Sequence, residues 1–154
     1  MHDISTRPIH LISISLLAVA LSAGCTDDSQ VNFLGTWAYS EGMFELDCNG
    51  QHMQFPLDAT LTETFVLGTD RDLSKADSGG CMGITFDVKG DVASLAPSPQ
   101  SCMIPNMGTS VADVYTITIS DDGDTLTASS SGMFTPMGSP GACTFVGGGT
   151  LAKQ

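Results

Sequence analysis

Short runs in which apolar and polar residues alternate at every second position make up most of the chain after residue 32. This alternation is typical of β-strands that bury one face, and no stretch of useful length has the spacing of an amphipathic helix. Gly, Asp and Pro separate the runs, so we predict about eight short strands. These strands are expected over residues 33–39, 43–48, 59–67, 82–88, 92–95, 114–120, 125–131 and 142–152.

The clearest hairpin lies in the second half of the chain. Tyr115, Ile117 and Ile119 alternate with polar residues, and the turn at 121–124 contains Gly123, which tolerates a positive φ. A small sheet exposes two edges unless it closes on itself. We therefore predict an all-β, disulfide-stabilised fold, an antiparallel up-and-down barrel of about eight strands, with a β-sandwich as the alternative.

The first 24 residues differ from the rest. A polar start with one full positive charge, Arg7, precedes an apolar run that is shorter than the roughly 20 residues of a membrane-spanning helix. Its length suits a secretory signal, and it ends in Leu21-Ser22-Ala23-Gly24-Cys25. We predict a signal peptide over 1–24, a lipidated N-terminus and tether over 25–32, and a single β domain over 33–154.

The end of the signal resembles the lipobox of bacterial lipoproteins, in which a bulky apolar residue and small residues precede a cysteine. The resemblance implies that Cys25 receives a diacylglyceryl group on sulfur, becomes the new N-terminus and is acylated on its amine. Two or three fatty chains such as palmitate anchor a protein stably. It also implies a cell-envelope location, and Thr26 favours the outer membrane over the inner. An ordinary secretory signal is the alternative.

Charge limits the partners that the domain can have. The full chain carries a formal net charge of −12, and acidic residues greatly outnumber basic ones after the signal. A nucleic-acid partner is not expected, because phosphate contacts need Lys and Arg. Anionic lipid would also repel this surface, so membrane attachment is expected to come from the lipid on Cys25. No other cofactor is expected.

Four cysteines follow Cys25: Cys48, Cys81, Cys102 and Cys143. An even number in an exported domain indicates two disulfides, for which three connectivities are possible. Cys81 and Cys102 flank one predicted hairpin, which favours the pairs Cys81–Cys102 and Cys48–Cys143. A metal site made of these thiols is not expected, because no pair has the C-x-x-C spacing.

Gly35-Thr36-Trp37, at the start of the first predicted strand, resembles the G-x-W opening of lipocalin-like and avidin-like barrels. That resemblance implies that Trp37 closes one end of a barrel and that the glycine lets the chain pass close by. The alternative is a tryptophan that anchors the core of an ordinary sandwich. Residues 147–149 are all glycine, which indicates a bulge, a bend or a close backbone approach in the last strand.

Glu63 shares a face with Leu61 and Phe65 in strict alternation. If that face points inward, a carboxylate lies inside the domain, where it could orient a polar ligand. A buried charge costs several kcal/mol unless it is paired. The preferred interpretation is therefore that a bulge turns Glu63 outward, or that Thr62 and Thr64 occupy the inward face instead.

No set of catalytic or metal-binding residues is predicted. His52 is the only histidine after the signal and has no accompanying nucleophile motif. The loops expected at 96–110 and 132–141 each carry a methionine pair, which a Cu(I) site could use but which also fills irregular gaps. The acidic turns at 70–72 and 121–124 do not have the spacing of a Ca²⁺-binding loop.

Two interpretations of the function follow. In the first, the domain is a non-catalytic interaction or structural module of the envelope, with another envelope protein as partner. In the second, it is a barrel that carries a small apolar ligand, which a filled core would exclude and an open cavity of roughly 300 Å³ would support. An enzyme or metal protein is the least favoured class. The expected lining residues are Trp37, Tyr39, Glu63, Phe65, Phe86 and Tyr115.

Overall fold

The computed structural model describes residues 28–76 and 81–154, so the predicted signal peptide and Cys25 lie outside the described residues. Within these ranges the chain forms one short 3-10 helix and ten strands. In chain order they are η1 (Asp28–Phe33), β1 (Gly35–Cys48), β2 (Gln51–Pro56), β3 (Thr62–Leu67), β4 (Leu73–Lys75), β5 (Thr85–Lys89), β6 (Val92–Leu95), β7 (Gln100–Ile104), β8 (Gly108–Ile119), β9 (Thr125–Pro136) and β10 (Cys143–Lys153).

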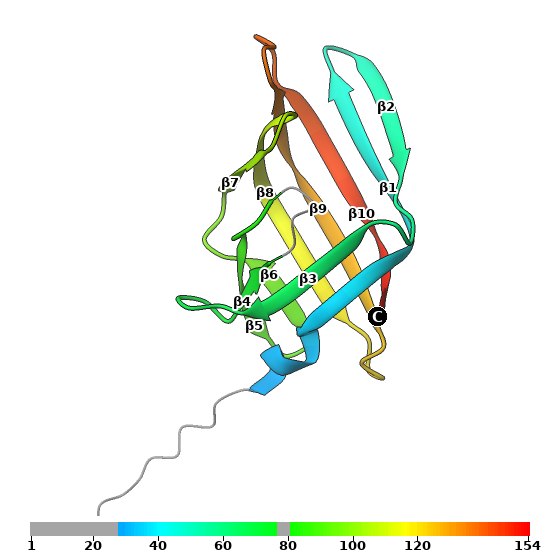
Figure 1. Ribbon diagram of the computed structural model, residues 1–154, viewed down its shortest axis with the longest axis vertical. Coiled ribbons are helices and arrows are strands. Elements are labelled where there is room, and N and C mark those ends of the chain that lie inside the picture. Colours follow the sequence, from blue (N-terminus) through cyan, green and yellow to red (C-terminus); the bar gives the residue numbers. More distant parts are fainter. Residues whose placement is uncertain (1–27, 77–80) are drawn as a thin grey trace, which may run out of the picture.

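Eight of the strands close into an antiparallel barrel (Figure 1). The order around the ring is β1, β3, β4, β5, β6, β8, β9 and β10, and β10 pairs with β1 to complete it. The predicted up-and-down barrel is confirmed, and the β-sandwich alternative is wrong. Strands β2 and β7 lie outside the ring, because β2 pairs only with β1 and β7 only with β8.

The barrel has two unlike halves because its long strands change partners along their length. The first residues of β1, up to Ala38, pair with β3, whereas Met43 and the residues after it pair with β2. A register shift between Tyr39 and Glu41 marks the change. Strand β8 changes in the same way from β7 to β6. We call the part near η1 the closed half, and the part flanked by β2 and β7 the open half.

Several strands differ from the sequence-based prediction. The segments 33–39 and 43–48 were expected as two strands, but β1 runs through both, because a bulge absorbs the break in alternation. Strands β2 and β4 were not expected. Strand β7 and the ends of β8 and β9 extend into the predicted loops 96–110 and 132–141.

The closed half contains the filled part of the core, where the large buried side chains pack. Helix η1 covers this end: Phe33 is fully buried, and the Trp37 indole Nε1 donates a hydrogen bond to the Phe33 carbonyl oxygen at 2.9 Å. Residues Asp28–Phe33, most of which lie in the range predicted as a tether, form helix η1, and Phe33 is its buried residue. The largest fully buried side chains are those of Trp37, Phe33, Phe65, Phe86, Leu73, Ile117, Leu126 and Leu151.

Both predicted disulfides are confirmed. Cys48–Cys143 joins the end of β1 to the start of β10 in the open half, and Cys81–Cys102 joins the segment before β5 to β7. The bridges span 95 and 21 residues of sequence. Closing loops of these lengths stabilises a fold by about 3–5 kcal/mol per bridge in the chain-entropy account.

Candidate ligand cavity

The inward side chains become smaller from the closed half to the open half. On β8, Ile117 and Ile119 fill the closed half, whereas Ser110 and Ala112 face inward in the open half. Strand β9 changes in the same direction, from leucine to serine and glycine, and on β10 an inward glycine, Gly147, lies between Leu151 and the lining residue Phe145. Because small side chains leave space between the strands, the core is filled near η1 and hollow beyond it. The inward residues of the two strands are Leu126, Ala128, Ser130 and Gly132 on β9, and Leu151, Gly147 and Phe145 on β10.

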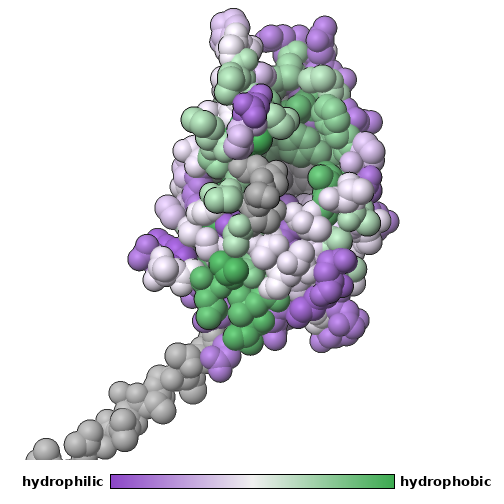
Figure 2. Space-filling view, in the orientation of Figure 1, coloured by the Kyte–Doolittle hydropathy of each residue, from purple (hydrophilic) through white to green (hydrophobic). Residues whose placement is uncertain are grey.

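A cavity of about 480 Å³ occupies the open half. In the space-filling view a hollow with apolar side chains around it opens in the same part of the molecule (Figure 2). Two rings form part of its wall: Phe44 and Phe145 stack with their centroids 5.5 Å apart. Phe44 lies against Gly147, where an added Cβ would come within 2.7 Å of the ring. The other large apolar lining residues are Leu57, Leu61, Ile84, Ile104 and Tyr115.

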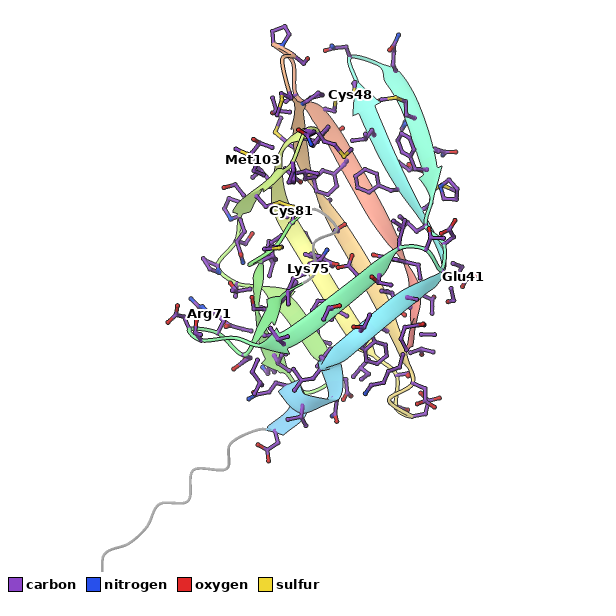
Figure 3. The ribbon with its side chains drawn as sticks, viewed as in Figure 1. Glu41, Cys48, Arg71, Lys75, Cys81 and Met103 are labelled. Atoms are coloured by element: carbon purple, nitrogen blue, oxygen red, sulfur yellow. A yellow bond between two sulfur atoms is a disulfide. The ribbon has the colours of Figure 1, made fainter. Side chains whose placement is uncertain are left out.

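The polar floor of the cavity consists of Tyr39, Glu63 and Lys75. The Lys75 ammonium forms an ion pair with Glu63 Oε2, and the two side chains are only 10% and 11% exposed. The Tyr39 hydroxyl donates a hydrogen bond to Glu63 Oε1 at 3.3 Å. In the stick view Lys75 lies inside the barrel, nearer the closed half than Cys81 (Figure 3). The floor therefore combines one positive and one negative charge with a hydroxyl group.

The expectation that Glu63 points outward is wrong. Glu63 and Phe65 both face inward, with relative exposures of 8% and 2%. The alternation over β3 is therefore maintained, and no bulge turns the carboxylate out. Lys75, which the prediction did not consider, makes this possible: it pairs with Phe65 across β3 and β4 and brings a compensating charge to the same face.

The structure divides the six predicted lining residues into two groups. Tyr39, Glu63 and Tyr115 line the cavity. Trp37, Phe65 and Phe86 face inward too, but they belong to the filled core of the closed half. The groups are in contact, because the Phe86 ring packs edge-on against Phe65 and against Tyr115, with centroids 5.9 and 5.2 Å apart. Alternation identifies the inward face, but it does not tell how far along the barrel a residue lies.

Other residues that line the cavity were not predicted. Lys75 lies on a strand of three residues, and Phe44 lies on the part of β1 that pairs with β2. Small residues at inward positions were the clearest indication of a cavity that the prediction did not use. Ser110, Ser130 and Gly147 occupy inward positions at which a filled barrel would carry large apolar side chains.

His52 lies away from the cavity. It is on the face of β2 that carries Gln54 and Pro56, its side chain is 66% exposed, and its Nε2 is 3.8 Å from Asp47 Oδ2. The four methionines of the predicted loops are all exposed, and three of them, Met103, Met107 and Met137, are more than half exposed.

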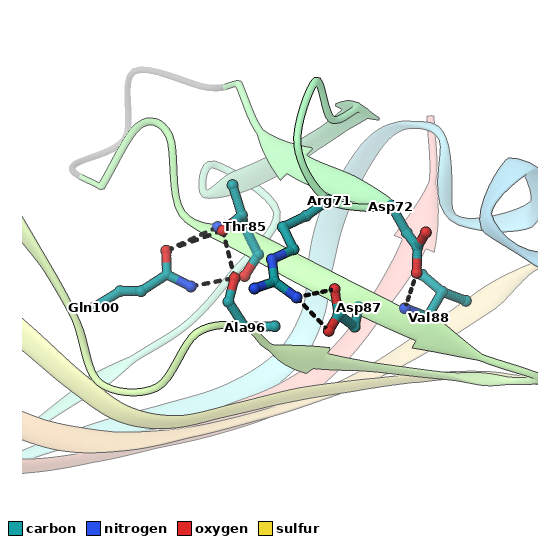
Figure 4. A network of polar contacts seen from close by, with 7 residues as sticks. All are labelled: Arg71, Asp72, Thr85, Asp87, Val88, Ala96 and Gln100. Atoms are coloured by element: carbon teal, nitrogen blue, oxygen red, sulfur yellow. Dashed lines mark hydrogen bonds and ion pairs between the residues drawn. The ribbon is translucent and has the colours of Figure 1, made fainter.

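The acidic turns hold the backbone in place. Arg71 donates two hydrogen bonds to Asp87, at 2.8 and 3.1 Å, and the Val88 amide donates to Asp72 Oδ2 at 2.7 Å (Figure 4). In the second turn, a hydrogen bond from the Ser120 hydroxyl lowers the pKa of Asp122 below its ordinary value. Over residues 28–76 and 81–154, no group of three or more His, Cys, Asp or Glu is arranged to hold a metal ion.

Comparisons with known proteins assign no family to this chain. The chain matches no protein-family model, and no curated protein or solved structure is significantly similar to it. Among the residues that the structure describes, none forms a helix of the length and apolar character needed to cross a bilayer.

Proposed function

We propose that this protein is a lipid-anchored envelope lipoprotein whose barrel binds a small, predominantly apolar molecule in the open half. The observation that carries the proposal is the cavity of about 480 Å³ with the Tyr39–Glu63–Lys75 floor. Binding sites for small molecules usually measure 300–1,000 Å³ and combine apolar walls with a few placed polar groups. A barrel that served only as a rigid structural module would gain stability from filling this space.

The walls favour an apolar body in the ligand. Burial of apolar surface contributes about 0.8 kcal/mol for each methylene group removed from water. An engineered apolar cavity of about 150 Å³ holds benzene, so the present cavity has room for a molecule with several rings or a medium-length chain. The stacked Phe44 and Phe145 rings offer an aromatic surface to such a body.

The anchor is the second part of the proposal. The lipobox-like ending at Cys25 supports diacylglyceryl attachment, and the acidic composition disfavours electrostatic docking on anionic lipid. The favoured role is a non-catalytic carrier or receptor at the outer membrane. The interaction module is the second candidate, and it predicts no saturable binding of apolar molecules.

Binding of the uncharged fluorescent probe N-phenylnaphthylamine tests the cavity. The protein is the full chain with Cys25→Ser, which removes the proposed acylation thiol and the need for detergent. We expect saturable fluorescence enhancement. Ser130→Leu, which places a larger side chain in the cavity, should weaken binding by about tenfold or more.

Ser129→Leu is the matched control. Ser129 is the neighbouring residue on β9, it is exposed, and its side chain points away from the barrel interior, so its substitution should leave binding unchanged. Circular dichroism of each variant verifies that the fold is retained. Absence of saturable binding, or equal effects of the two substitutions, would refute the proposed function.

A further inference from the structure

From the charges that line the cavity, and resting on the function proposed above, we infer that the natural ligand carries an uncharged polar group and places it against Tyr39, Glu63 and Lys75. Ligands of this class are alcohols, phenols and amides with an apolar body. Carboxylates and aliphatic amines, which are ionised at neutral pH, are excluded from it.

The charges on the described residues of the floor balance each other. Glu63 and Lys75 neutralise each other, and among the described lining residues no other side chain carries a charge. The remaining polar side chains of the lining bear hydroxyl groups, which donate and accept hydrogen bonds but do not compensate an ion. These hydroxyl groups belong to Tyr39, Thr60, Thr62, Ser110, Tyr115 and Ser130.

An anionic ligand would disturb this balance. A carboxylate that approached Lys75 would also lie beside Glu63, so the floor would hold two negative charges and one positive charge in a mostly apolar space. Like charges that share a buried site disfavour each other strongly. The formal net charge of −12 adds a long-range repulsion that acts on any anion near the protein.

A cationic ligand would be attracted by the protein as a whole but would meet a different obstacle at the floor. Its ammonium group would compete with Lys75 for Glu63 and break the buried ion pair between them. Breaking a buried ion pair in this way is strongly unfavourable. A hydroxyl or amide can instead hydrogen-bond beside the pair while the pair stays intact.

Two sets of matched probes test the inference on the Cys25→Ser chain at pH 7. The first compares N-phenylnaphthylamine with anilinonaphthalene sulfonate, which has the same ring system and a negative charge. The second displaces N-phenylnaphthylamine with 1-decanol, decanoate or decylammonium, each below its aggregation concentration. We expect the sulfonate, decanoate and decylammonium to bind at least about tenfold more weakly than their neutral counterparts.

The double substitution Glu63→Leu with Lys75→Met provides the control for the floor. It replaces the ion pair by apolar side chains of similar size. With decane added as a further competitor, the preference for 1-decanol over decane should fall by about three- to tenfold. Binding of decanoate or decylammonium as tight as that of decanol would overturn the inference while leaving the proposed function intact. Failure of every probe, including N-phenylnaphthylamine, would instead refute the proposed function.

Discussion

Removal of Lys75 alone should destabilise the protein far more than removal of a surface ion pair. The Lys75–Glu63 pair is about nine-tenths buried, so Lys75→Met leaves a carboxylate in the barrel with no ammonium beside it. Breaking a buried pair costs about 3–5 kcal/mol. Because the pair borders a cavity, we expect a value near the lower end, about 3 kcal/mol, in the free energy of unfolding measured with urea.

The double variant distinguishes charge from packing in this effect. Glu63→Leu with Lys75→Met removes both charges, so its unfolding free energy should lie within about 1–2 kcal/mol of the wild-type value and can exceed it. The two single substitutions would then be non-additive by about 3 kcal/mol in a double-mutant cycle. Additivity within about 0.5 kcal/mol would refute the argument that the two charges depend on each other.

Three further predictions concern other parts of the molecule. Intact-mass analysis of the exported protein should show diacylglyceryl and acyl chains on Cys25, and Cys25→Ser, where it is still cut at the same bond, should release the protein from membranes; firm membrane association of the cut variant would exclude a lipid anchor on Cys25. Replacing both Cys48 and Cys143 with alanine should lower the unfolding free energy by about 4 kcal/mol in urea titrations, and a change below about 1 kcal/mol would contradict the entropic argument. Ser120→Ala should return the pKa of Asp122 toward 3.8 in an NMR titration, because the Ser120 hydrogen bond is the main cause of its lowering. The hydrogen bond contributes fully to stability at pH values above the ordinary pKa of the carboxyl group. Its contribution is lost as the pH falls through the lowered pKa of Asp122 in the folded protein.

Much of the barrel could be predicted because alternation and turn residues act locally. Tyr115, Ile117 and Ile119 face inward as their spacing indicates, and Gly123 adopts the positive φ expected of the turn. The disulfide pairs followed from the hairpin that Cys81 and Cys102 flank. These features depend on neighbours within a few residues, or on elements that are adjacent in sequence.

Strands β2, β4 and β7 could not be predicted because local pattern does not define them. Strand β2 is an edge strand whose six residues are all exposed, and its apolar alternation is limited to Met53 and Phe55. Strand β4 has only three residues, and β7 lies between Pro99 and Pro105, which read as loop residues. Each is defined by pairing with a distant, stronger strand.

The candidate site was predicted only in part for a related reason. Glu63 was expected to face outward because its burial alone would be costly. The residue that offsets this cost, Lys75, lies on the next strand, β4, which the sequence did not predict. A cavity also forms where inward positions carry small residues in place of large side chains. Serine and glycine at inward positions such as Ser130 and Gly147 indicate it, but only once the barrel and its register are known.

Helix η1 packs on the end of the barrel that is opposite the cavity, and this fixes how an anchored molecule would be oriented. Cys25 precedes Asp28 by three residues, so the chain allows about 11 Å at most between their Cα atoms. Fatty chains on Cys25 would therefore hold the filled end of the barrel close to the bilayer surface. Cargo would then enter and leave on the side that faces the aqueous compartment, where a soluble donor or acceptor can reach it without displacing lipid.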